Sequence, residues 1–477
     1  MPVEQSLYLQ LAEKIAHAIR RGTLARGERV PSVREQARRE GVSLSTVVQA
    51  YRWLEDSRWI EARPRSGYFV TARPPRLPEP ETSLPPAASH EVLDISTLTE
   101  EVMRRAHDPA FVSFGAACPN GDLFTPERVR RAISRATQRH RDSLVRYPIG
   151  PGHESLRRAI ARHSLGMGCQ LDARDILVTN GCLESISLCL RAVTKPGDVV
   201  ALESPTYFGL LQVLQSLSLK ALELPTDARE GIDIGALRAA CEGQRIAACV
   251  LASSFSNPLG ATLAESRKLE VLALLAKHRL PLIEDDIYGD LGFGTAPLSR
   301  PFMALDKHGN TLHCSSFSKT LAPGYRIGWV AAGARHMPRL IEAKVASTLC
   351  GPVLPQLALA EFLASGGYDH HLRRVRRVFQ DTLHRMVRAI DESFPAGTRV
   401  SQPQGGFVLW LELPRGIDTR RLFAQALERG ICFAPGVVFS ASGRYANCLR
   451  VSGGHGWSPR IDKGLRALGA MARAWTR

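Results

Sequence analysis

The sequence has no long hydrophobic run and no closely paired cysteines. No apolar stretch in its 477 residues approaches the roughly 20 residues that span a membrane, and the N-terminal segment MPVEQSLYLQLAEK carries acidic residues early, unlike a secretion signal. The ten cysteines lie between Cys118 and Cys448 without a CxxC spacing, which argues against a zinc module or a disulfide framework. We therefore expect a soluble, cytoplasmic protein with reduced thiols, no metal site and no membrane contact.

The chain is long enough for more than one folded unit. A prior of about 150 residues per domain predicts two or three units, and a hydrophobic content of 44% is sufficient for packed cores. Lysine and arginine exceed the acidic residues, 62 against 46, which gives a net charge of +16. This charge is compatible with an anionic partner such as nucleic acid. A general preference for arginine explains it equally well, so a partner has to be argued from local patterns.

Three helices are predicted near the N-terminus. Apolar residues recur at helical spacing from Leu7 to Ile19. The segment SVREQARREG then predicts a short helix that Ser32 caps and Gly41 ends. Ser43 can cap the next stretch, LSTVVQAYRWLED. Two short helices joined by a glycine-containing turn have the spacing of a helix-turn-helix motif.

A β-hairpin is predicted after the third helix. It runs from Trp59 through the turn ARPRSG to Val70 and has Arg63 and Arg65 at its tip. Outward positions of the helices and of this wing are those that can meet phosphate oxygens or base edges. The excess of basic residues in this region is modest, and a small protein-binding helical domain fits the same pattern. Pattern and charge alone therefore leave both readings open.

The stretch RVPSVREQARREGVSLSTVVQAYRWLED, followed by ARPRSGYFV, resembles the GntR family of winged-helix regulators. The resemblance covers nearly all of residues 5 to 71 and implies a DNA-binding domain over residues 1–72. Together with the wing arginines, it gives six candidate DNA contacts: Arg34, Ser45, Thr46, Arg63, Arg65 and Gly67. The family often has an arginine just after the serine that opens the recognition helix, where this chain has Leu44. The operator sequence therefore cannot be carried over from relatives.

A change of pattern follows the first domain. Residues 73–90, RPPRLPEPETSLPPAASH, are rich in proline and predict an extended linker. Beyond it, short apolar runs alternate with helical stretches, which predicts βα units and a doubly wound, mostly parallel sheet in the α/β class. Ligands bind such sheets at the carboxyl ends of the strands. Polar or aromatic groups follow five predicted strands: Asn180 and Gly181, Pro205 and Tyr207, Asn257, Asp285, and Ser316 to Lys319.

These strand-end residues match the needs of pyridoxal phosphate (PLP). Lys319 supplies an amine for the cofactor aldehyde, and a carboxylate such as Asp285 keeps the pyridine nitrogen protonated. Asn257 and Tyr288 can donate to the phenolic oxygen, while Tyr207 can stack on the ring. Each residue alone has an ordinary explanation, as a surface lysine, a turn residue or part of the core. Their joint occurrence in this order favours a cofactor site.

The phosphate group of PLP needs hydrogen-bond donors. The segment TNGCLESI predicts a glycine turn that opens a helix, where backbone amides bind anions. An arginine fork suits phosphate as well. The candidate phosphate-binding residues are Gly181, Cys182, Leu183, Ser316, Ser318 and Arg326.

From about residue 90 to the C-terminus the chain resembles a fold-type I aminotransferase. The motifs that carry the resemblance, in order, are YPIGPGHESLR, TNGCLE, ESPTY, SNPLG, EDDIY, SFSKTLAPGYRIGW, GGFVLW and NCLR. It implies a PLP-binding domain over residues 91–477, with a large part at about 145–345 and a smaller α+β part made of the N-terminal arm and about 346–477. It also implies a homodimer in which Tyr147 reaches the neighbouring subunit's cofactor phosphate, and Arg450 as the ligand of the substrate α-carboxylate.

A GntR-like head, a proline-rich linker and this body together resemble MocR-type regulators. The resemblance implies a transcriptional regulator that binds double-stranded DNA, holds PLP as an aldimine of Lys319 and senses an amine or amino-acid effector. The loop from Phe114 to Asn120, FGAACPN, is expected to line the effector pocket. A working PLP-dependent aminotransferase with an appended DNA-binding head is the alternative, since Lys319, Asp285, Tyr288 and Arg450 are all present. A third hypothesis is a cofactor site that is kept only as a scaffold.

Overall fold

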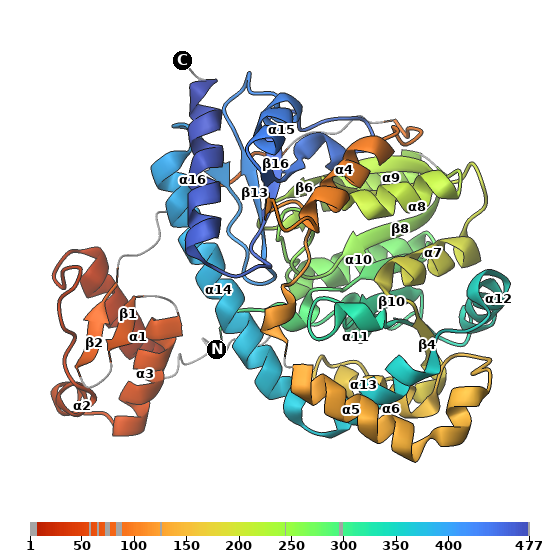
Figure 1. The fold of residues 1–477 in the computed structure, drawn as a ribbon, viewed down its shortest axis with the longest axis horizontal. Coiled ribbons are helices and arrows are strands. Elements are labelled where there is room, and N and C mark those ends of the chain that lie inside the picture. The colour runs from red at the N-terminus through yellow and green to blue at the C-terminus, as the bar shows by residue number, and fades with distance from the viewer. Residues whose placement is uncertain are drawn as a thin grey trace. The chain divides into compact units, whose positions relative to one another are not determined.

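The computed structural model describes residues 7–56, 59–63, 66–71, 77–82, 88–124, 126–243, 245–294 and 299–475. Its chain divides into two compact units, an N-terminal head within the first 76 residues and a body that holds nearly all the rest. Each unit is described by itself (Figure 1). Within the described residues, no helix is both long and apolar enough to cross a membrane.

The head has three helices and a two-stranded hairpin, as the sequence predicts. The elements are α1 (Leu7–Arg20), α2 (Val33–Glu40), α3 (Leu44–Asp56), β1 (Ile60–Arg63) and β2 (Gly67–Val70). The predicted caps are confirmed, since the Ser32 hydroxyl accepts the Glu35 amide at 3.2 Å and Gly41 ends α2 in the left-handed conformation at φ 65°. The winged helix-turn-helix architecture is therefore present.

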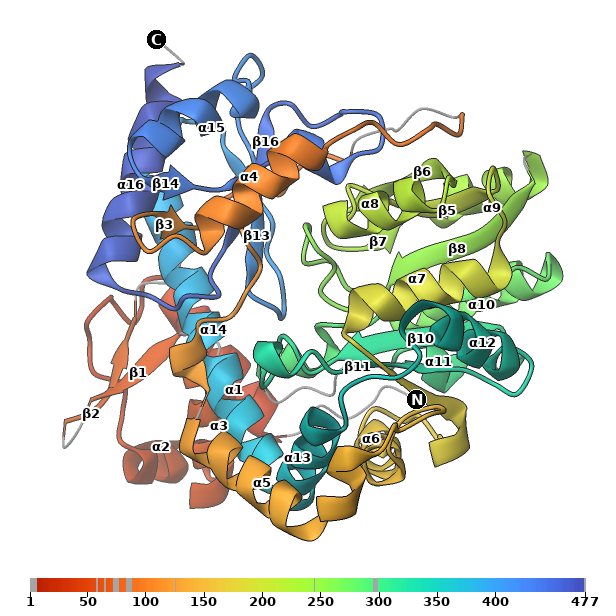
Figure 2. The ribbon, with the colours of Figure 1, turned by 45° about the vertical axis from the view of Figure 1, so that its right-hand side comes forward.

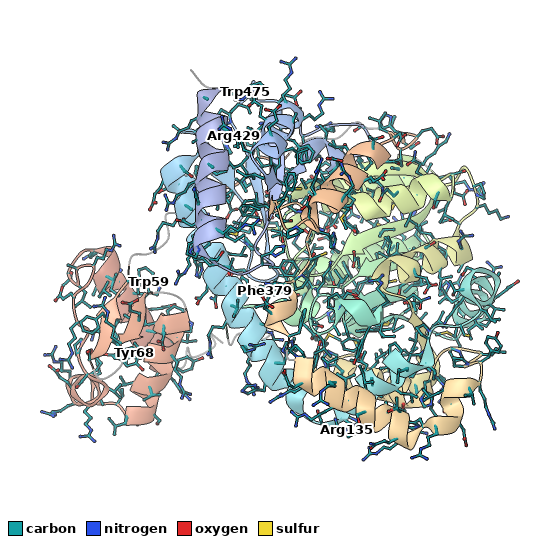
Figure 3. The ribbon with its side chains drawn as sticks, viewed as in Figure 1. Trp59, Tyr68, Arg135, Phe379, Arg429 and Trp475 are labelled. Atoms are coloured by element: carbon teal, nitrogen blue, oxygen red, sulfur yellow. The ribbon has the colours of Figure 1, made fainter. Side chains whose placement is uncertain are left out.

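The inward face of α3 forms the centre of the head's core. Val47, Tyr51 and Leu54 are fully buried, as their helical spacing predicts. The Tyr51 hydroxyl donates to the Pro31 carbonyl at 2.6 Å, and its ring lies edge-on to Tyr68 with centroids 5.0 Å apart. Figure 3 shows Tyr68 among the side chains of this unit. The hairpin thereby packs onto the helix that presents the candidate DNA-reading face.

The body contains an eight-stranded sheet in the order β4-β11-β10-β9-β8-β5-β6-β7. Its strands are β4 (Ile176–Thr179), β5 (Val199–Ser204), β6 (Lys220–Asp227), β7 (Gly231–Ile232), β8 (Ile246–Ala252), β9 (Leu282–Asp285), β10 (Thr311–Ser316) and β11 (Gly328–Ala331). Neighbouring strands are parallel from β10 through β9, β8 and β5 to β6. Only β11 and β7 run antiparallel to their neighbours. The mostly parallel sheet is as predicted.

Helices cover both faces of this sheet, so its central strands are buried along almost their whole length, including polar residues such as Glu203, Glu284 and His313. The helices of this part are α6 (Glu154–Leu165), α7 (Cys182–Val193), α8 (Phe208–Ser216), α9 (Ile234–Gly243), α10 (Glu265–Lys277), α11 (Phe302–Leu305) and α12 (Met337–Thr348). Figure 2 shows α7 across the sheet, where it contacts β4, β8, β9, β10 and β11. Residues of α9 and α10 share a buried cluster with alternate strand residues such as Ala201, Cys249 and Leu251. The strands' carboxyl ends are left to form a site.

A second sheet, of four strands, lies in the C-terminal part of the body. Its order is β12-β13-β16-β15, and its strands are β12 (Arg399–Val400), β13 (Val408–Glu412), β15 (Ala434–Pro435) and β16 (Cys448–Ser452). The helices around it are α14 (Gly367–Ser393), α15 (Thr419–Glu428) and α16 (Pro459–Ala474). The N-terminal arm joins this part, because β3 (Val112–Ser113) pairs with β14 (Ile431–Cys432) and α4 (Ser96–Ala106) packs beside both. Two further helices, α5 (Pro126–Arg139) and α13 (Val353–Ala364), pack together.

The boundaries of the predicted linker, residues 73–90, stay a prediction. One described segment of this linker, residues 77–82, lies against the body. The Val400 amide donates to the Pro78 carbonyl at 2.8 Å, and the Gln402 side-chain amide donates to the Leu77 carbonyl at 2.9 Å. Glu79 forms an ion pair with Arg229 at 2.6 Å. Within the predicted linker, this segment is therefore held by both the small sheet and the end of β6.

Candidate functional site

The strand-end residues gather along one edge of the large sheet. Asp285 ends β9 and Ser316 ends the neighbouring strand β10, while Asn257 follows β8 and Tyr207 follows β5. These four strands are adjacent and parallel, so their carboxyl ends meet at the same edge. Lys319 follows three residues after Ser316. The alternation of strands and helices thus brings distant motifs into one place.

Lys319 has the environment of a reactive amine. It lies just after β10, half-buried, and its Nζ donates to the Ala117 carbonyl at 2.6 Å. Burial lowers the pKa of the Lys319 amine; the nearby Cys118 raises this pKa, and the Arg450 guanidinium lowers it. A depressed pKa increases the neutral, nucleophilic fraction of the amine. This is the property that bonding to an aldehyde requires.

Asp285 is placed to meet a cationic ring nitrogen. Burial raises the pKa of the Asp285 carboxyl, whereas a hydrogen bond from the Cys182 thiol, 3.5 Å away, lowers it. A buried carboxylate of this kind is stabilised when an opposite charge arrives beside it. Asp286, by contrast, is held by the Ser253 hydroxyl at 3.0 Å. Asp285 is therefore the carboxylate of the pair that remains for a ligand.

A candidate anion site lies at the start of α7. Gly181 has φ 99° and caps α7 without a side-chain hydrogen bond, so the first-turn amides of Cys182 and Leu183 face outward from the helix end. This left-handed backbone favours glycine, and a Cβ at Gly181 would lie 2.5 Å from Nη2 of Arg326, so the guanidinium would have to move. Arg326 donates to the Asn180 carbonyl at 2.9 Å. Helix amides beside a guanidinium are the donors that a phosphate needs.

The two predicted serines lie at this anion site. Ser316 and Ser318 are both buried, and the Ser318 amide donates to the Ser316 hydroxyl at 3.3 Å. The Ser318 hydroxyl lies 3.5 Å from Nη1 of Arg326. The structure therefore places the hydroxyls of SFSK and the Arg326 guanidinium together. These residues fit the phosphate of PLP.

Arg450 is a fully buried guanidinium in β16. Nη1 donates to Oδ1 of Asn257 at 3.1 Å, and Nη2 donates to the Gly115 carbonyl. Among the described residues, Nε has no hydrogen-bond partner. Burial lowers the pKa of Arg450, because the charge loses its hydration there. A buried cation with neutral partners is suited to receive a carboxylate.

Two tyrosines lie near that guanidinium. Burial raises the pKa of Tyr207 to about 12, while the charge of Arg450 lowers it. The pKa of Tyr288 is likewise raised by burial and lowered by Arg450. The Tyr288 ring packs edge-on against Phe407, with centroids 5.5 Å apart. Both phenols therefore stay neutral at physiological pH and can act as hydrogen-bond donors.

Tyr147 does not join the other candidates within one chain. Its side chain is 77% exposed, and it makes no hydrogen bond with any described residue. Val145 and Ile149 beside it are also largely exposed, at 84% and 68%. The role given to Tyr147 needs a second subunit and stays a prediction.

The head presents only part of its candidate DNA contacts freely. Arg34 and Ser45 are exposed, although the Ser45 hydroxyl lies 2.7 Å from that of Ser43. The Thr46 hydroxyl, however, lies 2.8 Å from that of Ser43, which also accepts the Thr46 amide. Thr46 thus contributes to the start of α3 through the Ser43 cap.

In the wing, Arg63 is paired with Glu61 at 2.8 Å and lies over the Phe69 ring at 4.4 Å. Gly67 has φ 98°, and a Cβ there would come within 3.2 Å of Nε of Arg29. The candidate Arg65 lies outside the described residues. Arg29, which sequence reasoning missed, is thus a basic residue beside the wing.

Sequence reasoning also missed Glu203. It is buried near the end of β5, its Oε2 accepts the Ala252 amide at 3.0 Å, and its Oε1 has no partner among the described residues. Burial raises the pKa of Glu203 to about 8, and the charge of Asp285 adds to this. The signal in the sequence was a single acid inside the apolar run VVALES. A pattern search treats such an acid as the end of a strand.

Comparison with known proteins agrees with this architecture. Residues 112–468 match the family model "Aminotransferase class I and II", and residues 7–70 match "Bacterial regulatory proteins, gntR family". The chain belongs to the class I and II aminotransferase family. It carries a GntR-family helix-turn-helix domain at its N-terminus, and this combination is that of the MocR-type regulators. Class I and II aminotransferases are PLP-dependent.

Full-length relatives share both parts. The chain is 38% identical to the uncharacterized HTH-type transcriptional regulator YdcR of Escherichia coli, over 97% of this chain and 98% of that protein. It is also 38% identical to the regulator YjiR of the same organism, over 98% and 99%. Among solved structures, the α-aminoadipate aminotransferase LysN of Thermus thermophilus matches with a TM-score of 0.73 at 29% identity, over 80% of this chain and 99% of that one. The chain is therefore a GntR DNA-binding domain fused to an aminotransferase domain.

Proposed function

We propose that this protein is a PLP-dependent transcriptional regulator whose body binds an amine or amino-acid effector and whose head binds double-stranded DNA. The observation that carries the proposal is the buried Arg450 guanidinium, with an unpartnered Nε, at the same site as the Lys319 amine. A carboxylate receptor beside a reactive amine is a site for amino acids, and here it belongs to a chain with a DNA-binding head.

Four residues have distinct roles in this proposal. Lys319 would hold the cofactor aldehyde through its side-chain amine, and it is the group that an amine effector would displace. Asp285 holds the proton on the ring nitrogen, so that the cofactor can act as an electron sink. Gly181 and Arg326 would hold the phosphate, because the open start of α7 and the guanidinium lie next to each other. The cofactor's position is thereby fixed at both of its ends.

Arg450 determines the effector class. Two of its nitrogens are engaged by Asn257 and the Gly115 carbonyl, which fixes the guanidinium plane. An α-carboxylate would supply the negative charge that this buried cation lacks. The effector is therefore an amino acid or an amine with a carboxylate, and its amine reaches towards Lys319. Tyr207 packs against the ring of the cofactor.

A homodimer completes the proposed site. Tyr147 lies exposed on the surface in a stretch where Val145 and Ile149 are also exposed. Neighbouring apolar side chains of this kind are typical of an interface. In the dimer, Tyr147 of each chain contacts the cofactor phosphate of the other.

The regulatory part of the proposal requires that the effector bind two arrangements of the chain with different affinity. It is tested by fluorescence anisotropy with duplex DNA from the protein's own promoter region. The dissociation constant is measured for the cofactor-free, PLP-loaded and PLP-plus-amino-acid forms. We expect it to change at least about fivefold on addition of the effector, a typical allosteric coupling. Equal DNA affinity of all three forms would contradict regulation by the effector, but it would leave DNA binding by the head unchallenged.

A second candidate is a working aminotransferase with a DNA-binding head. Lys319, Asp285, Tyr288 and Arg450 are all present at the site, and the chain is 30% identical over 77% of its length to the 2-aminoadipate transaminase of Thermus thermophilus. The two functions are separated by mixing the PLP-loaded protein with a single amino acid and a second keto acid, which accepts the amino group and restores PLP for the next turnover. Turnover releases a keto acid in amounts above one per chain. A regulator changes its absorbance spectrum and its DNA affinity without sustained keto acid release.

A further inference from the structure

An arginine-lined cavity lies in the body, and none of its lining residues belongs to the strand-end site described above. It has a volume of about 380 Å³ and lies where α5 faces the end of α13 and the start of α14. Figure 2 shows these three helices side by side, and Figure 3 shows Arg135 on α5. The residues that matter are Arg128, Arg131, Arg135, Ser365, Gly366 and His370.

The three arginines converge because of their spacing. They stand at positions i, i+3 and i+7 of α5, which share one face of a helix. Glu361 is the acidic residue beside them, and it lies 3.4 Å from Arg135 and 2.8 Å from Arg139. Among the described residues, Arg128 and Arg131 have no carboxylate within ion-pair distance. Two guanidiniums therefore line the cavity without a counter-charge.

The neighbouring backbone adds to the positive potential. The 27-residue helix α14 begins at the cavity, and its N-cap, Gly366, is left-handed at φ 69° with no side-chain hydrogen bond. A Cβ on Gly367 would lie 3.0 Å from Nη1 of Arg128, so the guanidinium sits directly against the first turn. The pKa of His371 is lowered mainly by burial and then by the charge of Arg374. Arg128 and His370 lower this pKa further. Helix amides and guanidiniums thus face the same volume.

We propose that this cavity binds phosphoryl groups, as a second anion site distinct from the one at α7 and Arg326. A single carboxylate would leave one of the two unpaired guanidiniums uncompensated, whereas a phosphate or diphosphate carries two or more negative charges. The guanidinium groups that line the cavity match the geometry of phosphate oxygens, and the volume of the cavity accommodates a compact diphosphate. The phosphoryl group belongs to a free polyphosphate-type metabolite or to the DNA backbone.

The test uses the full-length, PLP-loaded protein, so that the cofactor's own phosphate site is filled. Inorganic diphosphate is titrated calorimetrically into the native chain, the double variant R128A/R131A and the control R130A, which lies on the same helix outside the cavity. For a free anion, we expect one diphosphate per native chain, binding weakened by about 10- to 100-fold in the double variant, and native affinity in R130A. If the double variant does not fold, R131A alone serves, because its side chain is exposed.

The second arm measures DNA affinity against salt, with one duplex limited to the head's half-sites and one extended on both sides. If the cavity holds a DNA phosphate, R128A/R131A reduces the slope of log K against log salt by about 1 to 2 for the extended duplex only. A loss in either arm, with R130A unchanged, supports the proposal and identifies the source of the phosphate. Native behaviour of the double variant in both arms, or an equal loss in R130A, overturns it. Because PLP stays bound and effector response is not measured, failure here is separate from failure of the regulatory function.

Discussion

At the scale of single residues, the burial of Glu203 makes the stability of the folded protein depend on pH. Its carboxyl lies inside the sheet beside Ala252, where burial raises its pKa to about 8, against 4.5 ordinarily. Between these two values the unfolded chain ionises and the folded chain does not. The folded state therefore loses stability as pH rises from about 4.5 to 8, and above 8 the loss is complete.

The variant E203Q removes this titration. In the cofactor-free protein we expect the free energy of unfolding of the native chain to fall, relative to E203Q, by a few kcal/mol between pH 5 and pH 8, on the order of 1.4 kcal/mol per pH unit. Urea unfolding at both pH values measures this difference. The exposed Glu100 provides a control, since E100Q should run parallel to the native chain. Parallel curves for the native chain and E203Q would show that Glu203 ionises freely when folded.

Gly181 is the residue on which the phosphate cradle depends. A methyl group there meets Arg326 at 2.5 Å and also strains a backbone at φ 99°. We expect G181A to bind PLP at least about tenfold more weakly, because Arg326 has to move. Gly197 has a similar φ of 87° but open space around it, so G197A carries the backbone strain without the collision. PLP affinity, measured by absorbance titration, should fall in G181A and stay native in G197A; equal losses would mean that strain alone explains the effect.

At the scale of elements, the sequence predicts those helices and strands whose apolar residues repeat with a local period. The helices of the head and the strands β4, β5, β8, β9 and β10 follow from buried apolar positions at the helical or extended period, and their ends carried the candidate site. The two-residue strands β3 and β14 have too little sequence to show a period, and they pair across more than 300 residues. The antiparallel insertion of β11 between β4 and β10 is likewise a non-local pairing. Such contacts depend on tertiary packing, which one sequence does not display.

The same division applies to the candidate site. Lys319 and Asp285 could be predicted because strand ends of a parallel sheet must meet. The loop of residues 114–120 was expected to line the effector pocket, but the sequence could not single out the carbonyls of Gly115 and Ala117, which accept from Arg450 and Lys319, because any residue type supplies a carbonyl. Glu203 was missed because its role arises from burial, which depends on the neighbouring strands.

The second helix of the head supports a prediction about DNA. Arg34 is exposed near the start of α2, with no ion pair to any described residue. If it contacts a phosphate, R34A should weaken DNA binding about tenfold and reduce the salt slope by about 1. Anisotropy titrations at several salt concentrations give both quantities. Arg21, exposed after the end of α1, is the control, and R21A should leave both unchanged; matched losses in R34A and R21A would indicate only a general effect of charge.

At the scale of the whole molecule, the proposed site is incomplete in one chain. The cofactor phosphate would receive donors from α7 and Arg326 of its own chain, while Tyr147 makes no hydrogen bond with any described residue and lies 77% exposed. Assembly and cofactor binding should therefore be linked, because a dimer would supply a contact that the monomer lacks. A substitution among the exposed residues 145–149 should therefore change the affinity for PLP, although it alters no residue at the start of α7.

Val145, 84% exposed, is the position that tests this link most directly. The variant V145D places a charge in the proposed interface, where its desolvation opposes association. Analytical ultracentrifugation should show a shift from dimer to monomer, and PLP should be lost on dialysis more readily than from the native protein. Leu269, 48% exposed on α10, offers a matched control, since L269D adds the same charge to a different exposed apolar position. If V145D is monomeric and still retains PLP as the native chain does, the partner's tyrosine is not needed to hold the cofactor, and Tyr147 has no role at the site.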